Sequence, residues 1–163
     1  MTPLLLTALL AGLAGSPHCV AMCGGFASAC ARPRAGFGAW HAGRLLAYAI
    51  LGAIAGAVGA ALPGPAWLPA LLATAFLVWF SAALAGLVPE PPLPVAGLGR
   101  IGQRLLGRPG ILPQFSFGIV NGFLPCGLVY SALAIPVALG SAGSGALAML
   151  AFGAGTIPLL SVA

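Results

Sequence analysis

The side chains of this 163-residue chain that could do chemistry are mainly four cysteines and two histidines. Its charged residues are six arginines and one glutamate, with no lysine or aspartate. A single carboxylate cannot form the carboxylate pair of acid–base catalysis, and no Ser-His-Asp triad or acidic metal cage can be built. The sequence therefore points to thiol chemistry, in which a cysteine thiolate attacks a disulfide.

Two of the cysteines stand in similar segments, GSPHCVAMCGGF (15–26) and NGFLPCGLVY (121–130). Each has a proline within two residues upstream, and a proline removes a backbone hydrogen bond of a helix. We expect Cys19 and Cys126 each to begin a half-helix, where the helix dipole favours the thiolate. The helix-disturbing residues that would support the two cysteines are Pro17, Pro125, Gly122 and Gly127.

A second interpretation of the first segment is metal binding. Cys19 and Cys23 are four residues apart and lie one turn apart on a helix face. His18 and Met22 have the same spacing on the adjoining face. Thiolate, thioether and imidazole form a soft ligand set that suits monovalent copper. Copper is therefore the cofactor of this alternative, whereas thiol–disulfide exchange needs no cofactor.

The composition indicates what kind of protein holds these cysteines. Apolar residues make up 61% of the chain and charged residues 4%. A soluble surface needs roughly a quarter to a third charged residues, and disordered chains are poor in apolar ones. The chain is therefore predicted to be an integral membrane protein in a lipid bilayer. We interpret the net charge of +5 as membrane topology and expect no nucleic-acid partner.

The hydrophobic pattern predicts an all-α polytopic membrane protein that forms a single transmembrane domain over residues 1–163. A spanning helix needs about 20 mostly apolar residues. Five stretches qualify, at about 3–29, 40–62, 67–88, 115–139 and 144–163.

The arginines predict the orientation of these spans. All six lie beside the connection between spans one and two or in the loop at about 89–114, at positions 32, 34, 44, 100, 104 and 108. Alternating spans put both regions on one side, which is the cytoplasm by the positive-inside rule, with the N-terminus outside. We expect His41 and Arg44 to lie at the cytoplasmic interface, where Arg44 reaches toward water. Asn121 is expected to hydrogen-bond to another helix.

The chain also shows a weak internal repeat. Aligning Cys19 with Cys126 places Gly15 on Gly122, and WHAGR (40–44) echoes FGAGT (152–156). The first copy covers about 1–88, and the second begins at about 115 and extends to 163. Because each copy would hold three spans, the two copies would enter the membrane in opposite directions. This three-plus-three inverted repeat needs a sixth span, so the second copy is expected to be truncated.

These motifs, together with HAGRLLAYAILGAIAGAVG (41–59) and FGAGTIP (152–158), resemble the DsbD/CcdA superfamily. The most similar branch is a small cytochrome-c-biogenesis transmembrane region, often labelled sulfite exporter TauE/SafE-like. The resemblance covers most of the chain. It implies a bacterial inner-membrane protein with six spans that works as a thiol-disulfide oxidoreductase-type electron transporter.

The resemblance also implies partners and a cysteine pair. Reducing equivalents would pass from cytoplasmic thioredoxin to extracytoplasmic thioredoxin-like or metallochaperone proteins and support cytochrome or oxidase maturation. The pair would be Cys19 in span one and Cys126 in span four. The extra cysteine, Cys23, leaves open which cysteine of span one pairs with Cys126. The branch is also associated with copper supply for haem-copper oxidases, which corresponds to the copper-handling alternative.

Overall fold

The molecule is seen as a computed structural model that describes residues 2–30, 34–61, 110–124 and 126–161, with isolated residues between 67 and 105. Within the helices, the side chains of residues 2, 22, 27–30, 34 and 35 are not described. The helices are α1 (Thr2–Cys30), α2 (Arg34–Ala61), α5 (Ile111–Gly122), α6 (Gly127–Ala132), α7 (Ala134–Leu139) and α8 (Ala142–Leu160). In the described part of the chain every regular element is a helix.

The helices agree with four of the five predicted spans. Three of them are long and apolar enough to cross a bilayer, over Pro3–Ala21, Gly36–Ala61 and Ala142–Leu160. Helix α5 and the α6–α7 pair together pass the same test as one span that is broken and bent by 68°. The predicted all-α polytopic membrane protein is therefore confirmed. The predicted span at 67–88 and the loop at 89–114 lie outside the described residues except for isolated positions and the start of α5.

The break in the fourth span lies where the sequence predicted it. Helix α5 ends at Gly122, and α6 begins at Gly127. Cys126 directly precedes α6 in an extended conformation, with φ −98° and ψ 137°. Its backbone N–H donates to the Leu124 carbonyl at 2.8 Å, which closes a tight turn inside the break. The thiol of Cys126 is therefore carried by irregular backbone between two half-helices. Pro125 lies outside the described residues.

The corresponding prediction for span one is wrong. Helix α1 is one helix from Thr2 to Cys30 with Pro17 inside it, so Cys19 does not begin a half-helix. Membrane helices tolerate an internal proline because neighbouring side chains and helices satisfy the freed backbone groups. The adjacent Ser16 hydroxyl donates to the Gly12 carbonyl within α1 at 2.9 Å and also lies 3.2 Å from the Gly155 carbonyl of α8. The hydroxyl thus ties α1 to its neighbour beside the proline.

The helices are held together where glycines let their backbones meet. A side chain on Gly12 would collide with the Phe152 backbone, so α1 crosses α8 at close range. Helix α2 crosses α5 in the same way, because a side chain on Gly118 would collide with the Trp40 backbone. Small residues at such crossings are the usual basis of packing between membrane helices, since lipid provides no hydrophobic drive for helix association.

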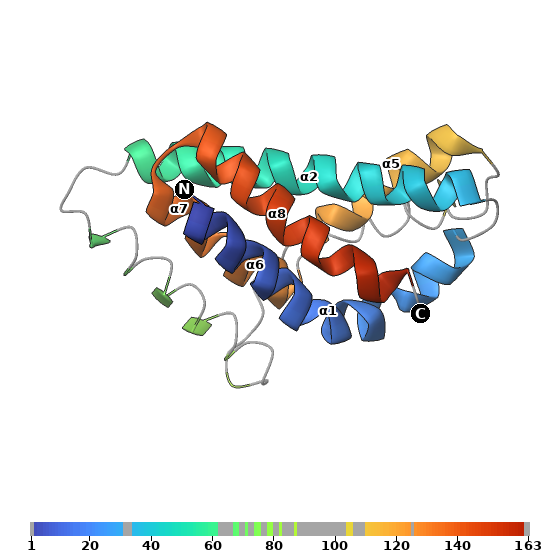
Figure 1. Ribbon diagram of the computed structural model, residues 1–163, viewed down its shortest axis with the longest axis horizontal. Coiled ribbons are helices and arrows are strands. Elements are labelled where there is room, and N and C mark those ends of the chain that lie inside the picture. The colour runs from blue at the N-terminus through green and yellow to red at the C-terminus, as the bar shows by residue number, and fades with distance from the viewer. Residues whose placement is uncertain are drawn as a thin grey trace.

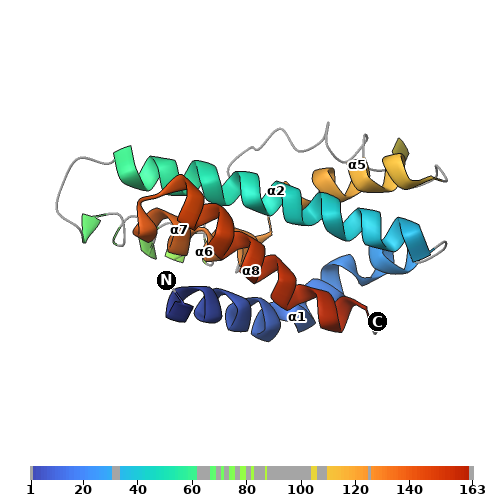
Figure 2. The same ribbon diagram turned by 45° about the horizontal axis from the view of Figure 1, so that its top comes forward.

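The directions of the helices follow from the ribbon. Figures 1 and 2 show α1 and α8 running one way along the molecule, whereas α2 and α5 run the opposite way. Helix α2 lies along α8 over much of its length, with Gly52 against the Gly145 backbone near one end and Leu45 against Gly153 near the other. Helices α2 and α8 therefore form the centre of the described bundle, with α1 and α5 packed against them.

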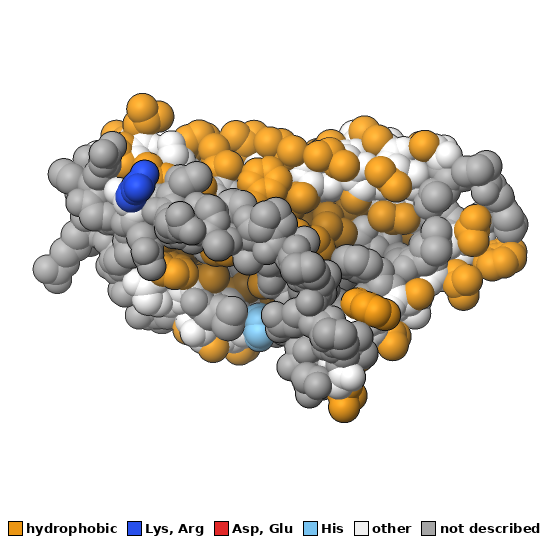
Figure 3. All heavy atoms as spheres, turned by 180° about the vertical axis from the view of Figure 1, so that it is seen from behind, with side chains coloured by type: hydrophobic (Ala, Val, Ile, Leu, Met, Phe, Trp, Pro, Cys, Tyr) orange, Lys and Arg blue, Asp and Glu red, His pale blue; other side chains and the backbone are white. Residues whose placement is uncertain are grey.

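The outer surface is suited to lipid. Many large apolar side chains of α1 and α2 are exposed, among them Leu6, Leu10, Ile54 and Val58. Figure 3 shows that hydrophobic side chains cover most of the described surface on the face seen there. A surface of this kind agrees with a protein that is embedded in a bilayer.

Candidate functional site

The structure places the candidate cysteines inside the bundle. Cys19 on α1 is 5% exposed and packs with Trp40, Phe117 and Leu160, which come from α2, α5 and α8. Cys23, one turn further along α1, is half-buried and packs against the same cluster. Cys126 is also half-buried and packs against a second cluster, which contains Tyr48 of α2. All three thiols are free.

These three thiols form one group although they come from distant parts of the sequence. Cys19 interacts electrostatically with both Cys23 and Cys126, and Cys23 also interacts with Cys126. The first two belong to α1, and Cys126 belongs to the break between α5 and α6. The fold therefore brings the cysteines of both sequence motifs to one place within the bundle.

Cys23 has a polar neighbour from the other half of the chain. Its Sγ lies 4.0 Å from Oδ1 and 3.9 Å from Nδ2 of Asn121, which is buried on α5. The prediction that Asn121 hydrogen-bonds to another helix is confirmed by this contact. The contact links α1 to α5 beside the thiols.

Arg44 of α2 lies close enough to these thiols to interact with them electrostatically. The sequence predicted that its side chain reaches toward water, but it is only 2% exposed, so that part of the prediction is wrong. Helix α2 begins at Arg34 rather than near Trp40, which places Arg44 ten residues into the helix, or about 15 Å along its axis. The guanidinium is therefore inside the bundle, and it interacts electrostatically with Cys19, Cys23 and Cys126.

Neutral groups hold the guanidinium in place. Nη2 of Arg44 donates to the Tyr48 hydroxyl at 3.2 Å and to Oγ1 of Thr156 at 3.3 Å. The central guanidinium carbon lies 4.9 Å from the centre of the Trp40 ring and 5.6 Å from that of Tyr48, which are cation–π distances. Thr156 itself donates to the Gly153 carbonyl at 2.7 Å and is fixed to α8. Residues of α2 and α8 thus fix the position of the charge.

The charge of Arg44 has no carboxylate partner among the described residues, because the chain's only acidic residue, Glu90, lies outside them. Nη1 has no hydrogen-bond partner in the described part of the chain. Placing an arginine at the centre of a membrane helix costs about 3 kcal/mol on insertion scales. Such residues mark functional sites in membrane proteins, so Arg44 joins the cysteines in the candidate site.

The predicted support residues have different positions. Gly122 lies at the end of α5, where an added side chain would collide with Ala47 and crowd the Arg44 backbone. Gly127 is the first residue of α6 and follows Cys126 directly. Pro17 is on the exposed side of α1, away from the thiols. The structure therefore brings Gly122 and Gly127 to the site and keeps Pro17 outside it.

Only some residues of the copper alternative lie together, since Cys19 and Cys23 interact and His18 does not join them. His18 is exposed and Cys19 is buried, so their side chains turn to different sides of α1. Within the described ranges, no group of three or more histidine, cysteine or acidic side chains is arranged to hold a metal ion. The side chain of Met22 lies outside the described residues.

Beside Arg44, the side chain of His41 is buried within the bundle. Its ring makes edge-to-face contact with Phe37 at 4.5 Å between ring centres and lies 4.8 Å from Trp40. His41 Nε2, Trp40 Nε1 and Gln114 Oε1 are buried without a hydrogen-bond partner in the described part of the molecule. Unpaired buried polar atoms are usually satisfied by ordered water. The α2–α5 interface therefore has polar groups that can hold water next to the site.

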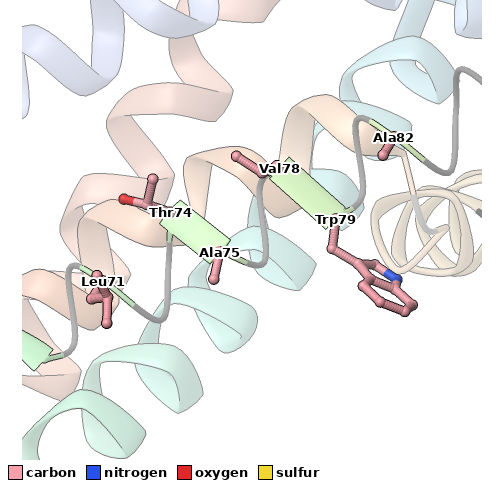
Figure 4. Close-up of a pocket in the computed structure, with 6 residues that line it drawn as sticks. All are labelled: Leu71, Thr74, Ala75, Val78, Trp79 and Ala82. Carbon is pink, nitrogen blue, oxygen red and sulfur yellow. The ribbon is translucent and has the colours of Figure 1, made fainter. Parts of the chain in front are cut away.

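A shallow groove lies elsewhere on the molecule and is distinct from the thiol group. Figure 4 shows its lining, which is apolar except for one threonine and consists of Leu71, Thr74, Ala75, Val78, Trp79 and Ala82. It contains none of the candidate residues. The groove therefore adds no chemistry to the site.

Sequence reasoning missed Arg44, Tyr48 and Thr156 as members of the site. Two signals were present in the sequence. An arginine within an apolar run is a functional-site candidate by default. The alignment of WHAGR (40–44) with FGAGT (152–156) also places Arg44 and Thr156 at equivalent positions, and in the structure these two side chains meet.

Comparison with known proteins identifies the family of the chain. Residues 7–163 match the family described as cytochrome C biogenesis protein transmembrane region. No curated protein and no solved structure matches the chain. The family match supports the resemblance to the DsbD/CcdA superfamily, and the sulfite-exporter label stays a prediction. Because the match covers nearly the whole of a polytopic helical bundle, the chain belongs to the family of cytochrome C biogenesis transmembrane proteins.

Proposed function

We propose that this membrane protein is a transmembrane electron carrier of the thiol-disulfide oxidoreductase type. The family links it to cytochrome c biogenesis. The observation that carries the finer proposal is the group formed by Cys19, Cys23 and Cys126 around Arg44. Thiols from two distant motifs that meet inside a bundle are suited to form and break a disulfide across the helices.

The proposed cycle moves two electrons at a time and needs no prosthetic group. In the oxidised carrier, Cys126 is joined by a disulfide to Cys19, with Cys23 as the alternative partner. A thiolate of reduced cytoplasmic thioredoxin attacks one sulfur, and the other sulfur leaves as a thiolate with the bonding electron pair. The second thioredoxin thiol then resolves the mixed disulfide. Thioredoxin ends as a disulfide, and the carrier ends with two thiols after it has taken up two protons.

The reduced carrier then repeats the exchange in the other direction. One of its thiolates attacks the disulfide of an extracytoplasmic thioredoxin-like or metallochaperone protein, and its second thiol resolves the mixed disulfide. The acceptor leaves with two thiols and the carrier returns to its disulfide. Flow is directed outward because the cytosol is reducing and the exterior oxidising. In this proposal the protein lies in the bacterial inner membrane with its arginine-bearing loops in the cytoplasm.

Two matching helix crossings support the proposed inverted repeat. Gly12 and Leu9 of α1 meet α8, where Gly155 contacts the Leu9 backbone. Likewise, Gly43 of α2 contacts the Phe115 backbone of α5. In each pair the first helix of one predicted copy packs against the second helix of the other. Rocking of two such copies would expose the thiols first to one side of the membrane and then to the other.

The electron carrier is proposed ahead of copper handling because His18 and Cys19 turn to different sides of α1. Copper handling is therefore treated as an outcome of the test. One tightly bound copper per chain that is lost in Cys23→Ser and kept in Cys126→Ser would replace the electron-carrier proposal.

The proposal is tested by counting free thiols in the full-length protein in nanodiscs. The protein is oxidised, treated with reduced or no thioredoxin, and labelled with a maleimide that shifts its mobility on a gel. Oxidised wild type should label two fewer cysteines than the thioredoxin-treated sample. This difference should vanish in Cys126→Ser and persist in Cys30→Ser, the matched control. Equal labelling of all four cysteines in both wild-type samples would overturn the proposal.

A further inference from the structure

Arg44 is a buried cation that has no carboxylate partner among the described residues. Its side chain is 2% exposed. The titratable groups that interact with it are His41, Tyr48 and the cysteines at 19, 23 and 126. Of these, the thiols are the groups that become anions most readily near neutral pH. A negative charge beside Arg44 is therefore expected to be a thiolate.

Two residues that contact Arg44 belong to the clusters against which Cys19 and Cys126 pack. Its guanidinium lies over Trp40, which packs with Cys19 in one buried cluster. It is hydrogen-bonded to Tyr48, which belongs to the cluster against which Cys126 packs.

Helix α5 connects Cys23 to the Arg44 backbone. Asn121, the neighbour of Cys23, is followed by Gly122, whose Cα faces the backbone of Arg44. Residues next to Arg44 therefore contact the cysteines of both motifs.

The hydrogen bonds of Arg44 leave part of the guanidinium available. Nη2 is used by Tyr48 and Thr156, both neutral acceptors on α2 and α8. Nη1 has no partner among the described residues. A guanidinium has five N–H donors in a fixed planar fork, so it can be held at one end and donate at the other. The neutral acceptors fix the charge, and the remaining donors face no competing anion within the described residues.

We propose that Arg44 is a positioning residue that stabilises the thiolate released when the membrane disulfide opens, an inference that rests on the proposed function. When a donor thiolate attacks one sulfur, the other sulfur leaves with the electron pair and acquires a negative charge. The fixed guanidinium balances this charge without giving up its proton. The same thiolate then attacks the acceptor disulfide, and its charge is transferred to the acceptor's leaving sulfur.

The proposal explains how a thiol can react inside an apolar layer. Burial in apolar surroundings suppresses thiolate formation, and a nearby cation restores it. Cys19 does not begin a half-helix, so helix polarity does not assist it. In this proposal the charge of Arg44, rather than a helix N-terminus, favours the thiolate form of the α1 cysteines.

The test measures thiolate reactivity in the reduced protein and therefore needs no redox turnover. Full-length wild type, Arg44→Gln and Arg44→Lys in nanodiscs are reduced, treated with iodoacetamide at pH 7 and mapped by mass spectrometry. In Arg44→Gln, the alkylation rates of Cys19 and of Cys126 should fall by about tenfold. Arg44→Lys should recover most of the rate, because it keeps the charge. Arg104→Gln, which removes an exposed arginine, is the matched control and should react like wild type.

The pH dependence separates electrostatics from misfolding. The difference between Arg44→Gln and wild type should shrink as the pH is raised, because alkaline solution ionises a thiol without help from Arg44. A deficit that is equal at every pH, or no deficit at pH 7, would overturn this inference. Neither result depends on whether a disulfide forms, so the proposed function is judged separately by the labelling experiment with thioredoxin.

Discussion

Arg44 of α2 donates a hydrogen bond to Oγ1 of Thr156 on α8 at 3.3 Å, and both side chains are buried. In the alignment of WHAGR (40–44) with FGAGT (152–156), these two residues occupy equivalent positions. One copy of the motif therefore supplies a charge, and the other supplies a neutral acceptor that helps to hold it. This difference between the copies places a buried cation beside a neutral acceptor.

The first prediction concerns this hydrogen bond. Thr156→Val keeps the shape of the side chain but removes the acceptor of Arg44. A hydrogen bond to a charged group is worth about 1.5–3 kcal/mol, so the melting temperature in detergent should fall clearly. Thr7→Val is the control, because the exposed Thr7 hydroxyl donates only within its own helix. Equal melting temperatures for the two variants would contradict the importance of this contact.

The second prediction separates stability from function at Arg44. An arginine within a membrane helix costs about 3 kcal/mol on insertion scales, and an apolar residue of similar volume avoids this cost. Arg44→Met should therefore melt at or above the wild-type temperature, while electron transfer from reduced thioredoxin to the membrane cysteines is lost. The measurement pairs thermal unfolding with the thioredoxin-dependent change in thiol labelling. A variant that loses both the fold and the activity would show that Arg44 is mainly a structural residue.

The third prediction concerns the crossing of α2 and α5. A side chain at Gly118 would collide with the Trp40 backbone, whereas nothing lies within 4 Å of the corresponding position at Gly38. Gly118→Leu should lower the free energy of unfolding by about 1–3 kcal/mol or more, since overpacking forces the helices apart. Gly38→Leu should have little effect on the melting temperature. Similar losses at the two positions would mean that the helices do not meet as described.

The fourth prediction concerns Asn121 and the role of Cys23. Asn121→Leu removes the amide beside the Cys23 sulfur but leaves the contacts of Cys19 in place. Loss of a hydrogen bond of about 1 kcal/mol should slow alkylation of Cys23 by about fivefold. Peptide mapping of the same sample gives Cys19 as the internal control. A uniform change at both cysteines would point to altered access rather than to the amide.

The sequence predicted much of the architecture because its signals are local. Long apolar runs predicted the helices α1, α2 and α8, and the proline before Cys126 predicted the break there. Pro17 was misleading because a proline in a membrane helix can be accommodated by neighbouring groups. Whether a proline breaks its helix depends on packing that the local sequence does not contain.

The candidate site was predicted only in part for a related reason. The cysteines were identifiable from their residue type and their repeated setting. Arg44 was misplaced because an apolar span was taken to begin near Trp40, whereas the helix begins at Arg34 and carries the arginine into the bundle. Tyr48 has no local motif, and the alignment of FGAGT with WHAGR does not show that Thr156 contacts Arg44, because that contact comes from the packing of α2 against α8.

The central claim is that Cys126 forms a reversible disulfide with a cysteine of α1. The most direct measurement is peptide mapping of the oxidised protein, digested without reduction from its own membrane. The account predicts a disulfide-linked pair that joins the peptide of Cys126 to the α1 peptide, with Cys19 or Cys23 as the linked residue. Oxidised protein in which Cys126 is never linked to either α1 cysteine would contradict it.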